Sequence, residues 1–109
     1  MKATRKLLVL FAATAAASAF AADAATLWKN HCADCHGMDG RGDTKKGQKL
    51  YISDLTDAEL QAKFTDDEAA KAIKSGLKDA KGKVIMEAVQ GVSDADVKAL
   101  VAHVRSLKK

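Results

Sequence analysis

The chain has 109 residues, of which 48% are apolar, and it carries 18 Lys and Arg against 14 Asp and Glu, a net charge of +4. This length suits one small domain and excludes a multidomain protein. The charge does not describe the folded domain, because the first 21 residues have the layout of a secretory signal peptide.

The predicted signal peptide has three parts. A basic start contains Lys2, Arg5 and Lys6, an uncharged and mostly apolar stretch runs over 7–21, and Ala19-Phe20-Ala21 forms a small-x-small cleavage site. The apolar stretch is short for a membrane span. We predict cleavage after Ala21, export to the periplasm, and a mature domain of residues 22–109.

The mature domain is almost neutral. Cleavage removes three of the 18 cationic residues and none of the 14 acidic ones, so the net charge falls from +4 to +1. This excludes a strongly basic nucleic-acid-binding domain, and no base-reading motif is present. No later apolar run is long enough to span a bilayer. We therefore expect a soluble monomer that binds no nucleic acid and has no membrane span.

The periodicity of the mature chain predicts helices and no strands. A first helix is expected from Asp23 to about His36, with Leu27 and Trp28 on its apolar side. An irregular segment over 37–53 follows, and four glycines interrupt it.

Three capping-box patterns predict the later helices. Thr56-Asp57-Ala58-Glu59 opens a short helix to about Lys63, and Thr65-Asp66-Asp67-Glu68 opens one that stops at Ser75-Gly76. A loop over 78–92 precedes Ser93-Asp94-Ala95-Asp96, which opens the last helix. Apolar residues recur there at i, i+3, i+4 and i+7, namely Val97, Leu100, Val101 and Val104.

The apolar core of this all-α domain is thin. Its aromatic residues are only Trp28, Tyr51 and Phe64. The two cysteines, Cys32 and Cys35, are three residues apart, so a disulfide would close a tiny loop and add little stability. Small domains of this kind commonly need a metal or cofactor to complete the core.

The candidate site is Cys32-Ala33-Asp34-Cys35-His36. On a helix, positions i, i+3 and i+4 share one face, so two thiols and an imidazole project together. C-x-x-C-H is the attachment signal for c-type haem, with two thioether bonds to the vinyl groups and the histidine on the iron. We predict one covalent haem c held by Cys32 and Cys35, with His36 as an iron ligand.

The motif has three other possible interpretations. A thioredoxin-like redox pair needs a preceding strand and a βαβ pattern, which the sequence does not show. A zinc site needs four convergent ligands, and His31, Cys32, Cys35 and His36 diverge within one helical turn. A plain structural disulfide is the third reading.

The second iron ligand must come from a distant part of the chain. Met86 lies in the loop before the last helix and is our candidate, because His/Met ligation is the common arrangement of low-spin electron-transfer haems. The alternative is a methionine that fills a gap in the core. Met38 and His31 are too close to His36 to reach the opposite face of the haem. His103 lies beside the apolar stripe of the last helix and is expected to be a packing residue.

The residues resemble the small mono-haem class I cytochromes c of bacteria over nearly all of the mature chain. The segments that carry the resemblance are 27–37 with the C-x-x-C-H motif, the glycine-rich 38–43, Ser53-Asp54-Leu55-Thr56, and 92–107. The resemblance implies three to five helices wrapped around one haem, with the first and last helices crossing. Trp28 and Leu100 or Val101 are the candidates for the crossing.

Two positions depart from this family pattern, and the chain has no proline. Ser53 stands where the family has a proline whose carbonyl accepts a hydrogen bond from the iron-bound imidazole. The carbonyl of Ser53 is still available for that bond. Glu87 replaces the proline that often follows the ligand methionine, which leaves the Met86 loop less rigid.

The predicted function is one-electron transfer between respiratory redox partners, such as an oxidase, a reductase or a dehydrogenase, without enzymatic activity. Six lysines near the haem motif and Met86 are candidates for docking an acidic partner, namely Lys45, Lys46, Lys49, Lys78, Lys81 and Lys83. The alternative is a haem enzyme or gas sensor in which the Met86 bond opens. A further possibility is an electron-accepting subunit of a larger complex.

Overall fold

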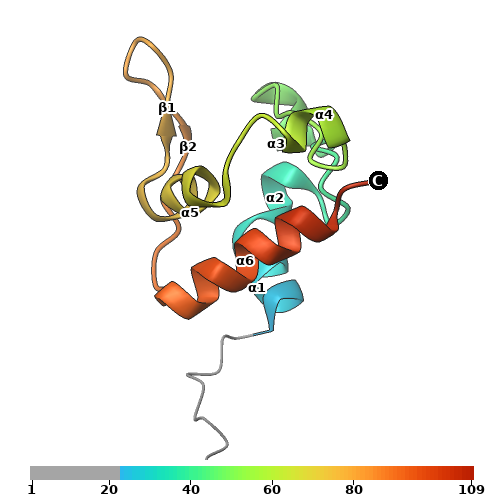
Figure 1. Ribbon diagram of the computed structural model, residues 1–109. Helices are drawn as coiled ribbons and strands as arrows, with labels where there is room; N and C mark the ends of the chain where they lie inside the picture. The colour runs from blue at the N-terminus through green and yellow to red at the C-terminus, as the bar shows by residue number, and fades with distance from the viewer. Residues whose placement is uncertain (1–22) are drawn as a thin grey trace, which may run out of the picture.

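The computed structural model describes residues 23–109, so the predicted signal peptide lies outside the described residues. Six helices and one small hairpin follow in chain order (Figure 1). They are α1 (Ala24–His31), α2 (Ala33–His36), α3 (Lys45–Lys49), α4 (Ala58–Gln61), α5 (Asp66–Ser75), β1 (Leu77–Lys78), β2 (Val84–Met86) and α6 (Asp94–Ser106). In this part of the chain no helix has both the length and the apolar character needed to cross a bilayer.

The predicted first helix is divided in two. Asp23 caps α1 through a bond from the Ala25 amide, as a side-chain oxygen before a helix does. The backbone of Cys32 then departs from helical geometry, with φ −121°. Cys32 is both the C-cap of α1 and the N-cap of α2. The prediction of one continuous helix to His36 was therefore wrong in detail.

The last helix, α6, crosses α1 and builds the core with it (Figure 1). The capping box predicted at Ser93 is confirmed, since Ser93 and Asp96 exchange both side-chain bonds with the backbone. All four predicted apolar positions of α6 are buried, and Leu100 is 0% exposed. Trp28, at 2% exposed, lies in the same apolar cluster, as the predicted crossing requires.

Of the two capping boxes predicted for the middle helices, the one at Thr65 is confirmed and the one at Thr56 is wrong. Thr65 and Glu68 form theirs, and α5 ends at Gly76, whose φ of +73° suits a glycine. Thr56 does not cap α4, because its hydroxyl donates to Asp54 at 2.6 Å. Asp57 is the cap instead, and α4 ends at Gln61, earlier than predicted.

Two elements were not predicted. The segment expected to be irregular contains α3, which Thr44 caps. The expected loop after Lys78 contains an antiparallel hairpin in which Leu77 pairs with Met86 and Lys78 with Val84. Asp79 stabilises the turn by accepting bonds from the Lys81 and Lys83 amides at 2.9 Å. The absence of strands was thus a wrong prediction, although the fold remains mainly helical.

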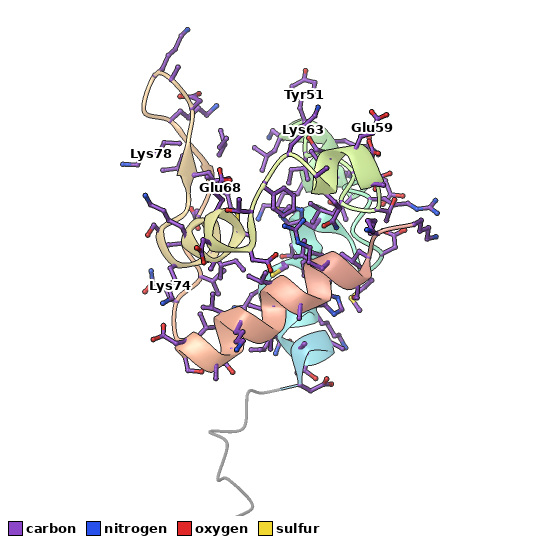
Figure 2. All side chains as sticks on the ribbon, viewed as in Figure 1. Tyr51, Glu59, Lys63, Glu68, Lys74 and Lys78 are labelled. Carbon is purple, nitrogen blue, oxygen red and sulfur yellow. The ribbon has the colours of Figure 1, made fainter. Side chains whose placement is uncertain are left out.

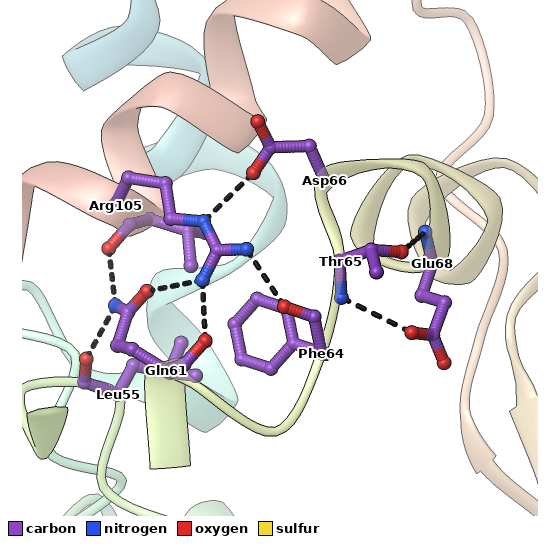
Figure 3. A network of polar contacts seen from close by, with 8 residues as sticks. Leu55, Gln61, Phe64, Thr65, Asp66, Glu68 and Arg105 are labelled. Carbon is purple, nitrogen blue, oxygen red and sulfur yellow. Dashed lines mark hydrogen bonds and ion pairs between the residues drawn. The ribbon is translucent and has the colours of Figure 1, made fainter. Parts of the chain in front are cut away.

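A partly buried polar network joins α4, α5 and α6 (Figure 3). The side-chain amide of Gln61 donates to the carbonyl oxygens of Leu55 and Val104, both at 2.7 Å. Arg105 donates to the carbonyl oxygens of Gln61 and Phe64 and to the Asp66 carboxylate. Its guanidinium lies 4.5 Å from the centroid of the Phe64 ring. The network thus satisfies the Gln61 carbonyl at the end of α4 and the carbonyl groups of Leu55 and Phe64 on either side of that helix.

Replacing the arginine of this network should destabilise the fold. Arg105→Met removes charged donors from two carbonyl oxygens, and we expect the free energy of unfolding to fall by about 2 kcal/mol or more. Lys98→Met on the exposed side of α6 is the control and should change it by roughly 0.5 kcal/mol or less. Urea unfolding of the purified, cofactor-loaded protein measures both. Equal losses in the two variants would contradict this role for Arg105.

Candidate cofactor-binding site

The C-x-x-C-H residues occupy one helical turn. The amides of Cys35 and His36 both donate to the Cys32 carbonyl oxygen, at 3.2 and 2.9 Å. Neither cysteine is in a disulfide. The structure thus brings two free thiols and an imidazole together on a turn that hydrogen bonds hold in place.

The environment of Cys32 favours the neutral thiol. Its side chain is buried in the apolar cluster, and this burial, together with the nearby Cys35, raises the pKa of Cys32 to about 11. Reactive thiols of disulfide oxidoreductases have lowered pKa values in electropositive surroundings. Cys32 therefore lacks the thiolate character that a thioredoxin-like redox pair needs.

The imidazole of His36 is free to bind a metal. Burial lowers its pKa, so the neutral form, which has a free nitrogen lone pair, dominates at neutral pH. Its Nδ1 atom is buried, and within residues 23–109 no group forms a hydrogen bond with it. The bond considered above, to the carbonyl of Ser53, is thus not formed, and Ser53 is exposed.

The glycine-rich loop and α3 pack directly behind the motif. The Thr44 hydroxyl donates to the carbonyl of Asp34 at 2.7 Å, and the Gly42 amide donates to that of His36 at 2.7 Å. A Cβ atom at Gly47 would collide with the carbonyl oxygens of Cys35 and Gly42. Glycine at this place lets α3 approach closely enough to fix the position of the motif.

Met86 comes to the site from a different element. It ends β2, is partly buried, and packs against the apolar cluster that includes Cys32. The loop after it is attached to α5, because the Val89 amide donates to the Ile73 carbonyl at 2.8 Å. The structure thus connects Met86 and the C-x-x-C-H turn through one apolar core, although 50 residues of sequence separate Met86 from His36.

The other methionine and histidines considered as iron ligands are exposed or pack against Trp28. Met38 is 59% exposed, and His31 is exposed as well. His103 packs against Trp28, with 5.0 Å between the ring centroids, and its Nε2 atom is buried without a partner. Among residues 23–109, no three or more His, Cys, Asp or Glu side chains are grouped as a metal site would need.

The sequence analysis missed one contact of the site. The ring of Trp28 lies 5.6 Å from that of His36, centroid to centroid. The two residues are eight positions apart, close to two helical turns, and this spacing could have placed them on one side of the chain.

Comparison with known proteins identifies the family. The family model described as Cytochrome c matches residues 21–108. The chain belongs to the cytochrome c family. A solved structure, the KustC0563 c-type cytochrome, is 35% identical, and the match covers 81% of this chain and 100% of that chain with a TM-score of 0.67. No curated protein matches the chain.

Membership of the cytochrome c family confirms the predicted resemblance and the predicted fold class. The family holds haem c covalently and uses it for electron transfer, and Cys32 and Cys35 have the C-x-x-C-H spacing. The residues present fit the group, since the thiols are free and the adjacent imidazole has no hydrogen-bond partner. The fit to a covalent haem rests on the combination of the free thiols, the neutral imidazole and the thin apolar core, and on no single residue.

Covalent attachment should depend on both thiols. Acid–acetone extraction of the exported protein should leave the haem on the chain, and mass spectrometry should give the mass of residues 22–109 plus one haem. Because each thioether attaches the haem independently, Cys32→Ala or Cys35→Ala alone should retain one bond, and the double variant should lose all haem on extraction. Freely extractable haem, or two titratable thiols in the purified protein, would contradict covalent attachment.

Proposed function

We propose that this cytochrome c is a periplasmic one-electron carrier with His36 and Met86 as the two iron ligands. The observation that supports it best is that the free Cys32, Cys35 and His36 turn and the partly buried Met86 adjoin one apolar cluster. When bound, haem supplies exchange of one electron between Fe(II) and Fe(III). The predicted signal peptide, residues 1–21, supports export.

Each proposed site residue has a distinct task. Cys32 and Cys35 would attach the haem covalently, so that the carrier cannot lose it in the periplasm. The neutral imidazole of His36 would bind the iron from one side, and the soft thioether of Met86 from the other, where it favours Fe(II). With both axial positions filled, no position remains for a substrate, which favours a carrier over an enzyme.

Met86 should control the spectrum and the reduction potential. Met86→Ala should abolish the sulfur-to-iron charge-transfer band of the oxidised protein and lower the potential, because the thioether stabilises Fe(II). Met38→Ala, at an exposed methionine, is the matched control and should leave both unchanged. A charge-transfer band that survives Met86→Ala would show that another residue binds the iron.

A haem enzyme or gas sensor is the second candidate, and one observation favours it. Met86 and the exposed Glu87 both line an open surface cavity beside the hairpin, together with Ser75, Leu77, Lys78, Val84, Ala88 and Gln90. A methionine with open space beside it has room to leave the iron. An enzyme or sensor requires that Met86 dissociate from the iron so that a small ligand can bind there. A carrier requires that Met86 stay bound.

We also propose that the partner of this carrier is acidic. Lys45, Lys46 and Lys49 are exposed on α3, and Lys78, Lys81 and Lys83 are exposed on the hairpin. Within residues 23–109, none of these six forms an ion pair. Figure 1 shows α3 and the hairpin at the same end of the molecule, away from the start of α6. Tyr51, which projects from the surface in Figure 2, follows the α3 lysines and is 93% exposed.

Unpaired lysines at one end should make electron transfer sensitive to salt. Oxidation by ferricyanide, a small anionic probe, should slow as ionic strength rises, because salt screens the attraction. Replacing Lys45, Lys46 and Lys49 with Gln should slow it several-fold at low salt, whereas Lys29→Gln and Lys98→Gln on α1 and α6 should not. A rate that does not change with ionic strength would contradict the docking surface.

A further inference from the structure

The indole ring of Trp28 is in contact with the rings of two histidines. It is 2% exposed, and its ring centroid lies 5.6 Å from that of His36 on α2 and 5.0 Å from that of His103 on α6. The two pairs of ring planes are tilted by 40° and 38°. One side chain of α1 therefore contacts both the C-x-x-C-H turn and the last helix.

Trp28 also holds the backbone next to His36. Its Nε1 atom donates to the Gly37 carbonyl oxygen at 2.8 Å, in a buried hydrogen bond. The Gly42 amide donates to the carbonyl of His36 itself at 2.7 Å. The peptide groups that follow the imidazole are thus fixed by two bonds, and Trp28 provides the one that comes from a side chain.

The orientation of the His36 ring needs such a contact. A histidine that binds a metal normally donates its other ring N–H to an oxygen, and that bond fixes the rotation of the ring. Across residues 23–109 the His36 imidazole has no hydrogen-bond partner, although its Nδ1 atom is buried. The hydrogen bond that commonly orients the ring is missing here, and the ring of Trp28 is in contact with the imidazole.

We propose that Trp28 is a positioning residue that sets the orientation of the His36 imidazole at the iron, through ring packing and through its bond to Gly37. This inference rests on the proposed role of His36 as an iron ligand. His103 of α6 also packs against the indole, so the orientation is coupled to the packing of α6 on α1. A core residue without an N–H group would fill the same space but would not hold Gly37.

The test compares Trp28 with a neighbouring core residue in the haem-loaded protein. Trp28→Phe keeps an aromatic ring and removes the N–H donor, and Trp28→Leu removes both. Leu27→Ala is the control, because Leu27 is buried on the same helix and is not in ring contact with His36. The measurement is the set of hyperfine-shifted haem methyl and axial-imidazole signals in the NMR spectrum of the oxidised protein. The signals of the Met86 side chain are recorded beside them, because the haem methyl shifts depend on the orientations of both axial ligands.

We expect the spread of the haem methyl shifts to change in Trp28→Phe and to change further in Trp28→Leu, while Leu27→Ala keeps the native pattern. A native pattern in Trp28→Phe and in any Trp28→Leu that folds would overturn the proposal, and so would the same altered pattern in Leu27→Ala. Failure of the underlying function is distinguishable, because a native protein without hyperfine-shifted signals from His36 would show that His36 is not a ligand.

Discussion

The crossing of α1 and α6 is the contact on which the rest of the molecule depends. Trp28 and Leu100 are almost completely buried there, and they belong to the same apolar cluster as Cys32. Since the C-x-x-C-H turn begins where α1 ends, the crossing fixes the start of the site. The buried apolar residues described over 23–109 belong to this one cluster, so the position of the turn depends on α6 staying packed on α1.

The proposed iron ligands come from two parts of the chain that are held by different means. His36 lies on a short turn that is fixed by the glycine-rich loop, by α3 and by Trp28. Met86 lies at the end of a hairpin whose following loop is attached to α5 through Val89. The Arg105 network then joins α5 to α6, so both parts are connected to one framework. This arrangement suits a carrier, because small structural change accompanies fast electron exchange.

The sequence predicted those elements of the fold that are decided by interactions between residues close in sequence. It failed where contacts between distant residues decide the structure. The caps at Thr65 and Ser93 and the stripe on α6 were correct, because each rests on residues three or four positions apart. Thr56 failed as a cap because Asp54 takes its hydroxyl. The Thr44 cap is a local signal for α3, but the central Gly47 is a poor helix former and is required there by close packing on Cys35. The site motif could be predicted from residue spacing, and the eight-residue spacing of Trp28 and His36 is compatible with one side of the chain. The bond of Trp28 to the Gly37 carbonyl and its packing against His103 needed the three-dimensional structure.

We propose that the iron of this cytochrome c is closed on both sides and exchanges only electrons. The most direct measurement is the absorption spectrum of the dithionite-reduced native protein before and after addition of carbon monoxide at neutral pH. Two bound ligands, His36 and Met86, predict an unchanged spectrum. A shift of the Soret band to that of a carbon monoxide complex would show that one position opens, and it would contradict the carrier in favour of a haem enzyme or gas sensor.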